Sequence, residues 1–455
     1  MIGGLLFFVF LGCLLLAFAF NQNAMSPAKY YLGTCAVFFG DVFINKDTSI
    51  AIALCYLGLL ACGVVLVVVE SRNVAPKPMK TARSAAQPQL KSLAKSNGWL
   101  VIWSLTLIPM LALYTLVQRF GAEVDLSDAI AQRVLLFQGY GYLTITLTLL
   151  PTLNAAYFVH CLVLGRRSRL IWLGWGLHVV ITFGIQSLMG SRTGLLNVGL
   201  FLVLISHYIW RRHSAQFYAV FAIGLLAAAS FLGTIRNTMR ISDGRLDLNL
   251  DKAESVLNLS VIREGVSPLE VIFNTKSPRL EWGATFATAL TNLIPRAWWP
   301  GKPDTGGVVY TKNYLENQWD GYSNATPGWL GEWMMNFGPV LGLILGFASL
   351  AGLLWWLGIW YAKLERQKVS AGNPLRHGLA VICFLYTVQA VTGLLIGEFT
   401  NCAVHWGAKL ALVICIGKFW NVSVFHSPPR RRRYSWSWPG WRTENFGSAT
   451  IPLER

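Results

Sequence analysis

Charged residues are scarce in this chain, and the motifs that bind metals or nucleotides are missing. Of its 455 residues only 13% are charged, about half the share of a soluble globular domain, and 54% are hydrophobic. The sequence holds no Cys/His metal spacing, no DxD-type acidic cluster, no P-loop and no dinucleotide fingerprint. The composition excludes an ordinary soluble domain and indicates a polytopic membrane protein, while the missing motifs disfavour metal-dependent nucleotide-sugar chemistry.

Disulfides and a cleaved leader are also not expected. Nearly all of the eight cysteines fall inside apolar runs, which argues against a disulfide framework. The first apolar run, residues 1–20, has neither a basic start nor a small-residue cleavage site. We therefore expect it to be a retained helix.

Long apolar runs take up most of the chain. A membrane span needs about 20 mostly apolar residues, and no run shows the period-two alternation of a strand. We predict an all-α bundle of about 11 transmembrane helices, or about 10 if the short second run, which carries Asp41, is re-entrant or interfacial. The predicted spans are about 2–20, 29–45, 49–69, 99–118, 139–164, 170–190, 194–210, 215–235, 338–361, 376–396 and 403–425.

Basic residues gather beside one set of span ends. They occupy 70–97, 166–169, 211–212, 363–376 and the tail with Arg430–Arg433. Because Lys and Arg are enriched in cytoplasmic loops, this side is predicted to be cytoplasmic and the other face non-cytoplasmic, which in a bacterial inner membrane is the periplasmic face. The net charge of +17 is then explained by cytoplasmic loops and anionic lipid, without nucleic acid.

Four regions follow from this pattern: membrane helices over 1–235, a long periplasmic loop over 236–337, further membrane helices over 338–425 and a basic cytoplasmic tail over 426–455. The loop contains eleven of the 21 acidic residues and ten Lys or Arg. From Leu246 its apolar residues have helical spacing, which predicts surface helices, and its second half is rich in Pro and Gly, which predicts an ordered irregular segment. After it, Gly338, Gly342 and Gly346 predict close helix packing.

Several cations of the periplasmic side could bind an anion. Arg192 lies in the tight turn Gly190-Ser-Arg-Thr-Gly between two spans, and it is either a snorkelling anchor or the cation of an anion site. Within the loop, Arg236, Arg240, Arg279, Arg296 and Lys302 are the residue types that recognise phosphate or diphosphate.

Four residues on the same side are candidates for a general base: Glu332, Asp304, Glu398 and His405. Glu332 lies beside Trp333 just before a span, where its pKa could be raised. The simpler interpretation is a carboxylate that satisfies backbone N–H groups at a helix start. A structural role is equally open for His405, and Glu398 could simply pair with Lys409.

Three short motifs resemble the Wzy-type O-antigen and oligosaccharide repeat-unit polymerases. They are Gly190–Arg192 between two spans, the stretch LIPRAWWPGKP from Leu293 to Pro303, and the acid-bearing segment Thr326–Gly338 that leads into a Gly-rich helix. The spacing Arg296-x10-Gly307 is similar to an Arg-x10-Gly pattern of some members.

This resemblance implies a membrane glycosyltransferase of the GT-C class B type that joins undecaprenyl-diphosphate-linked repeat units without a metal or other cofactor. By analogy Arg192, Arg236, Arg279, Arg296 and Lys302 would hold the donor diphosphate. Glu332 or His405, with Arg296, would be catalytic, and Trp298, Trp299 and Trp329 would contact sugars. Membrane lipid, and possible partners in the form of a chain-length regulator and a flippase, follow from the resemblance in the same way.

Two other functions stay open at this point. One is an O-antigen ligase that moves finished glycan onto lipid A core, although such ligases often carry a functional His in the long loop and this loop has none. The other is a transporter for a lipid-linked glycan, although the chain lacks the matching halves that many transporters have.

Overall fold

Helices make up nearly all of the computed structural model. It describes residues 2–21, 23–73, 98–120, 141–164, 168–188, 192–221, 223–224, 239–242, 245–248, 262–276, 279–292, 294, 298–315, 325–370 and 373–424. In these residues seven helices are long and apolar enough to cross a membrane. The structure therefore confirms a helical, membrane-embedded chain, while the predicted total of eleven spans stays a prediction.

The long helices begin and end close to the predicted span limits. They are α1 (Ile2–Phe20), α4 (Ile50–Asn73), α6 (Gly98–Phe120), α9 (Gly141–Leu147) with α10 (Leu150–Val163), α11 (Arg169–Leu188), α12 (Arg192–Ile209), α18 (Pro339–Ser370), α19 (Pro374–Gly393) and α20 (Phe399–Phe419). Most of the predicted eighth span, 215–235, lies outside the described residues, as do most of the 70–97 segment and the tail from 425.

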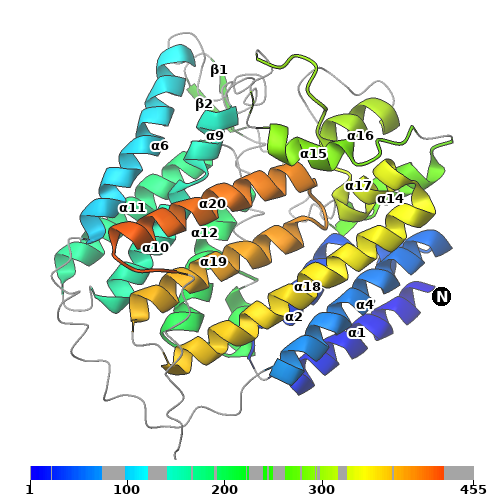
Figure 1. Ribbon diagram of the computed structural model, residues 1–455, viewed down its shortest axis with the longest axis horizontal. Helices are drawn as coiled ribbons and strands as arrows, with labels where there is room; N and C mark the ends of the chain where they lie inside the picture. Colours follow the sequence, from blue (N-terminus) through cyan, green and yellow to red (C-terminus); the bar gives the residue numbers. More distant parts are fainter. Residues whose placement is uncertain are drawn as a thin grey trace, which may run out of the picture.

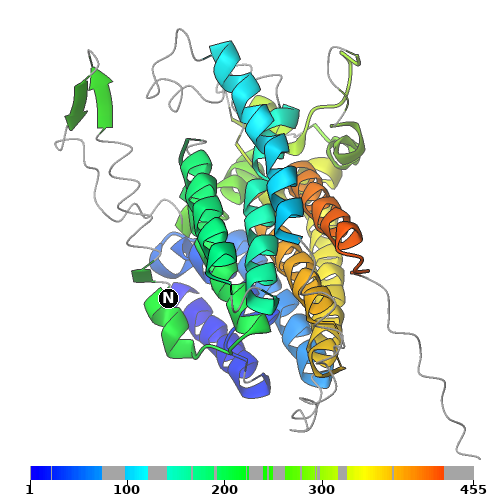
Figure 2. The same ribbon diagram turned by 90° about the vertical axis from the view of Figure 1, so that its left-hand side faces the viewer.

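The bundle has α10 and α19 near its middle. Helix α19 is buried along almost its whole length and contacts α10, α12, α18 and α20. Helices α18, α19 and α20 run side by side, with α4 and α1 beyond α18 (Figure 1). Helices α6 and α11 lie on the opposite side of the bundle from α4 and α1 (Figure 1), and Figure 2 views the molecule from the side of α6. The helices that carry the polar loop residues, α14 to α17, cluster at one end, which we call the loop end (Figure 1).

The predicted second span is broken into two short helices. Helix α2 (Pro27–Phe38) ends at Phe39, and α3 (Asp41–Ile44) follows directly. Gly40 allows this break, because a Cβ there would lie 2.7 Å from the Ala36 carbonyl oxygen. Neither helix has the length of a span, and so the run is not among the seven.

The predicted loop helices are only partly correct. Helix α14 (Ser267–Asn274) confirms helical structure, whereas 239–248 forms an antiparallel hairpin of β1 (Met239–Ser242) and β2 (Arg245–Leu248). Here the alternation Leu246-Asp247-Leu248 has the period of a strand, and it outweighs the helical spacing read from the same residues. The second half of the loop was predicted to be irregular, and this is wrong over three short helices between the prolines: α15 (Ala284–Thr291), α16 (Gly306–Tyr314) and α17 (Gly328–Phe337).

The glycine stripe packs a loop helix against a span. A Cβ at Gly342 of α18 would lie 2.5 Å from the Trp333 carbonyl oxygen, and one at Gly346 would lie 3.1 Å from a Leu330 methyl. Gly338 ends α17 with φ +84. The predicted close packing is confirmed, and its partner is α17, which is held rigidly against α18.

Candidate functional site

Helix α17 is anchored to the turn that joins α19 to α20. The backbone N–H of Trp329 donates to the Leu394 carbonyl at 2.7 Å, and its indole N–H donates to the Gly346 carbonyl at 3.0 Å. Gly328 has φ +68, and a Cβ there would lie 2.7 Å from the Leu395 carbonyl oxygen. A glycine is therefore needed at this position for both conformation and space. These contacts fix where α17 presents its acidic side chain.

Two buried carboxylates face helix N-termini across this junction. Glu332 of α17 is 0% exposed and accepts a hydrogen bond at 2.7 Å from the backbone N–H of Phe399, the first residue of α20. Glu398, which is 1% exposed and precedes α20, accepts one from the backbone N–H of Gly307 in α16. Each acid thus uses one oxygen to satisfy a free N–H group of a helix to which it does not belong.

The surroundings of this acid pair favour the protonated carboxyl. The pKa of Glu332 is raised to about 7, mainly by burial and to a smaller extent by the charge of Glu398, against the lowering effects of the Phe399 N–H and the Thr285 hydroxyl. The Thr285 hydroxyl has this effect from nearby, because Glu332 Oε1 has no regular hydrogen-bond partner among the described residues. Burial also raises the pKa of Glu398, against the lowering effects of the Gly307 N–H and the Thr305 hydroxyl. A pKa near neutrality suits a group that takes up and releases protons.

Glycine allows α16 to close over Glu332. A Cβ at Gly306 would lie 2.6 Å from Glu332 Oε1, so any other residue there would displace the carboxyl or the helix. Thr305 precedes α16 in an extended conformation, as a helix N-cap does. The sequence Thr305-Gly306-Gly307 is thus the signal that could have located the covering element, and the sequence reasoning did not use it.

Hydroxyl and amide groups of α15, α17 and α20 surround the acid pair. Thr288 and Thr400 share a short hydroxyl–hydroxyl contact, and Thr400 also donates to the Thr285 carbonyl at 3.2 Å. Asn336 Nδ2 donates at 2.7 Å to both Thr285 Oγ1 and the Glu332 carbonyl oxygen. All four side chains are buried. They are the residues that sequence reasoning missed, since single Thr and Asn residues carry no spacing signal.

The predicted catalytic residues do not all meet. Glu332 lies in the acid pair, whereas His405 lies within α20, with Nδ1 at 3.4 Å from Thr148 Oγ1. Arg296 lies outside the described residues. Asp304 forms an ion pair with Lys312 at 2.6 Å, which gives it a structural partner.

The predicted diphosphate ligands are described only in part. Arg192 is the first residue of α12, but its side chain lies outside the described part, and so do Arg236 and the side chain of Arg240. Arg279 is exposed beside the loop helices. Lys302 donates to the Ile294 carbonyl at 2.9 Å, which ties down the loop backbone. The predicted diphosphate site therefore stays a prediction.

The three predicted sugar-binding tryptophans divide into two kinds. Trp298 and Trp299 are 82% and 41% exposed and present their rings outward from the loop. Trp329 is 4% exposed, packs against Phe286 and Phe399, and uses its indole N–H within the protein. Contact with a sugar is thus open to the first two, and Trp329 belongs to the core of the loop end.

Among the residues that the structure describes, no group of three or more His, Cys, Asp or Glu side chains could hold a metal ion.

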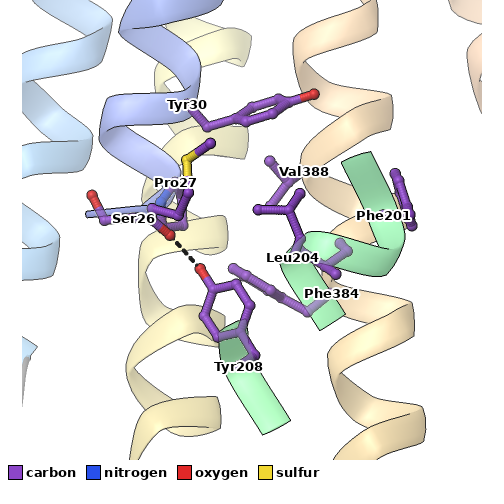
Figure 3. Close-up of a pocket in the computed structure, with 10 residues that line it drawn as sticks. Ser26, Pro27, Tyr30, Phe201, Leu204, Tyr208, Phe384 and Val388 are labelled. Carbon is purple, nitrogen blue, oxygen red and sulfur yellow. Dashed lines mark hydrogen bonds between the residues drawn. The ribbon is translucent and has the colours of Figure 1, made fainter. Parts of the chain in front are cut away.

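A narrow apolar pocket lies away from the acid pair, between α2, α12 and α19 (Figure 3). It is lined by Ser26, Tyr30, Phe201, Tyr208 and Phe384, among others, and Tyr208 donates to the Met25 carbonyl there. None of the predicted site residues contributes to it.

Comparison with known proteins assigns no class to this site. The chain matches no model of a protein family, no curated protein and no solved structure. The function is therefore argued from the acid pair and its surroundings.

Proposed function

We propose that the chain is a membrane glycosyltransferase that polymerises undecaprenyl-diphosphate-linked oligosaccharide repeat units on the periplasmic side of a bacterial inner membrane. The observation that carries the proposal is the acid pair, because Glu332 and Glu398 are buried where the polar loop docks on the membrane bundle. Such an enzyme needs one proton acceptor beside a surface that can hold sugars and a diphosphate.

In this proposal Glu332 takes the proton from the acceptor sugar hydroxyl as that oxygen bonds to the donor sugar. The bond between the donor sugar and its diphosphate breaks, and the lipid diphosphate leaves with the electron pair. With a pKa of about 7, Glu332 is ionised in a useful fraction of molecules at neutral pH. Because Gly306 covers the carboxyl, the acceptor reaches it only when α16 separates from Glu332.

Glu398 acts on Glu332 through charge. An ionised Glu398 disfavours ionisation of Glu332, so the Glu332 carboxylate binds the proton that it takes from the acceptor more strongly. The exposed rings of Trp298 and Trp299 offer flat surfaces on the same loop against which sugar rings can pack. Arg279 is a cation on this face for the diphosphate, together with the predicted Arg192, Arg236 and Arg296.

Transport of a lipid-linked glycan is the second candidate, and a specific observation favours it. Lys409 lies within the span formed by α20, and Lys29 is buried near Glu70 of α4. Ionisable groups at membrane depth frequently mark a transport path. The acid pair, in contrast, gathers at one end of the bundle, where a transferase needs it.

Glycan profiles of a deletion strain test the proposal. Cells that lack the gene should display single repeat units, and the wild-type gene should restore a ladder of lengths. Glu332→Gln should leave single units, and Glu365→Gln, a matched change at the other end of the bundle, should restore the ladder. Long lipid-linked polymer that accumulates without surface glycan would contradict polymerisation and indicate a ligase. Repeat units trapped on the cytoplasmic face would indicate a transporter.

A further inference from the structure

The middle of α20 is packed differently from α1. In α1 a buried stripe of Leu6, Phe10, Cys13 and Ala17 alternates with exposed residues. In α20 every residue from 402 to 410 is half-buried, on all sides of two and a half turns. Every side of this stretch therefore keeps some accessible surface, including the sides turned toward the bundle.

This stretch carries a cation. Lys409 is the eleventh residue of the 21-residue helix α20, which places its backbone near the middle of the span. Its amine lies 4.8 Å from the centre of the Tyr386 ring in α19. Within the described residues no carboxylate oxygen lies within 4.0 Å of it. Eleven residues separate it from Glu398, about 16 Å along the helix, so the predicted Glu398–Lys409 pair is wrong.

An ammonium group at this depth needs an anion or water. Burying an unpaired charge is costly, and ionisable residues within spans mostly pair or serve a function. Side chains of a helix lean toward its N-terminal end, and the N-terminus of α20 is at the loop end. The amine therefore lies closer to the loop-end surface than its Cα does, within reach of a polar group that enters from that side.

Further polar groups lie along the same stretch of α20. His405, one turn before Lys409 and on the same side of α20, lies 3.4 Å from Thr148 Oγ1 at the α9–α10 junction. Trp406 donates its indole N–H to Thr387 of α19 at 2.9 Å. One cation, one imidazole and one hydroxyl thus lie along the seam where α20 meets α19 and the α9–α10 junction.

We propose that this seam along α20 binds the phosphate group of a membrane lipid, with Lys409 as its counter-ion and His405 and Thr148 as hydrogen-bonding partners. An amphiphile suits the site better than a free anion, because the helices around Lys409 are apolar and accommodate acyl or prenyl chains while the amine pairs with the phosphate. The inference is independent of the proposed transferase, since a lipid phosphate would bind here with or without catalysis.

Native mass spectrometry of the full chain in detergent tests the site with three probes: dioleoyl phosphatidic acid, dioleoyl phosphatidylcholine and inorganic diphosphate. The wild type should prefer phosphatidic acid over phosphatidylcholine about tenfold, as expected for one charge-assisted contact. Lys409→Met should abolish the preference, and Lys409→Arg should retain most of it. Lys418→Met, an exposed lysine in the last turn of the same helix, should behave as wild type.

Three results would overturn the proposal. Lys409→Met could keep the wild-type preference, wild type could bind both lipids equally, or inorganic diphosphate could displace the lipid at equal concentration, which would make a free anion the ligand. If Lys409→Met does not fold, His405→Gln is the second variant. It should weaken the preference about threefold, and an unchanged preference in that variant would equally count against the site.

Discussion

The two ends of the bundle both bury carboxylates, but they satisfy them differently. At the end opposite the loop, Glu70 accepts hydrogen bonds on both oxygens, from Asn21 Nδ2 at 2.9 Å and from the Ala28 N–H at 2.8 Å, with Lys29 as a nearby cation. At the loop end, Glu332 and Glu398 each accept one backbone hydrogen bond and face each other's charge. Both oxygens of Glu70 therefore have hydrogen-bond donors, whereas Glu332 and Glu398 each keep one oxygen that can carry a proton.

The network opposite the loop continues through several helices. Asn23 donates to the Tyr361 hydroxyl at 2.8 Å, and Lys29 donates to the carbonyls of Asn21 and Asn23. His207 Nδ1 accepts the His213 N–H at 2.9 Å, so its Nε2 carries the hydrogen that bonds Asn23 at 2.6 Å. A network whose members each have partners fixes helix positions. We therefore assign a structural role to this end and the chemistry to the loop end.

The largest expected effect is the loss of the complete network. Glu70→Ala leaves the Asn21 amide, the Ala28 N–H and the Lys29 amine without their acceptor or counter-charge, which should cost about 3–5 kcal/mol. A large drop in melting temperature and in yield of folded protein in detergent is expected. A variant as stable as wild type would show that this end is not structural.

The second largest expected effect is a dependence of stability on pH that arises at the loop end. Glu332 has a folded pKa of about 7 against an ordinary value of 4.5, so the folded state holds its proton more tightly. Stability is then full below about pH 4.5, falls as the pH rises to about 7 and stays level above it, with a total loss of at most about 3 kcal/mol. Melting temperatures at pH 5 and pH 8 measure this. Glu332→Gln, which is always neutral, should show a smaller decrease, and an identical slope in both proteins would refute the assignment.

The rigidity of the loop end rests on close packing of α17 on α18. Gly342→Ala places a methyl 2.5 Å from the Trp333 carbonyl oxygen and should destabilise the protein by about 1–3 kcal/mol. Gly352→Ala is the matched control in the same helix, since its Cβ would meet nothing within 4 Å. That variant should be neutral or slightly stabilised. Equal melting temperatures for the two variants would mean that α17 is not held by this contact.

The smallest effect is expected from a surface pair. Arg212 lies 2.5 Å from Glu365, but its side chain is 52% exposed and the pair is open to solvent. Arg212→Ala should therefore change stability by about 0–1 kcal/mol. A loss comparable to that of Glu70→Ala would make this pair part of the buried network and would weaken the contrast between the ends.

Much of the bundle could be predicted, because membrane spans need long apolar runs that are legible in sequence. The limits of α1 and the start of α18 follow from such runs, whereas α18 continues to Ser370, nine residues beyond the predicted end at 361. The break between α2 and α3 could not be predicted, since it depends on Gly40 fitting against the Ala36 carbonyl. The hairpin at 239–248 was missed because a four-residue alternation is too short to compete with a helical pattern around it.

The candidate site was predictable only for single residues. Glu332 and Glu398 were both identified as acids near span ends. Their meeting depends on the docking of α16 and α17 over the start of α20, which joins residues 67 and 91 positions apart. The burial of Trp329 and the separation of Lys409 from Glu398 depend on the same three-dimensional arrangement.

Polymerisation by purified protein in proteoliposomes is the most direct test of the loop-end site. The substrate is an undecaprenyl-diphosphate-linked repeat unit, and the readout is the length distribution of the lipid-linked glycan over time. The account predicts that wild type and Glu365→Gln build a ladder and that Glu332→Gln builds it at least about 100-fold more slowly while remaining folded. A Glu332→Gln protein that builds the ladder at the wild-type rate would contradict the assignment of proton transfer to this carboxyl.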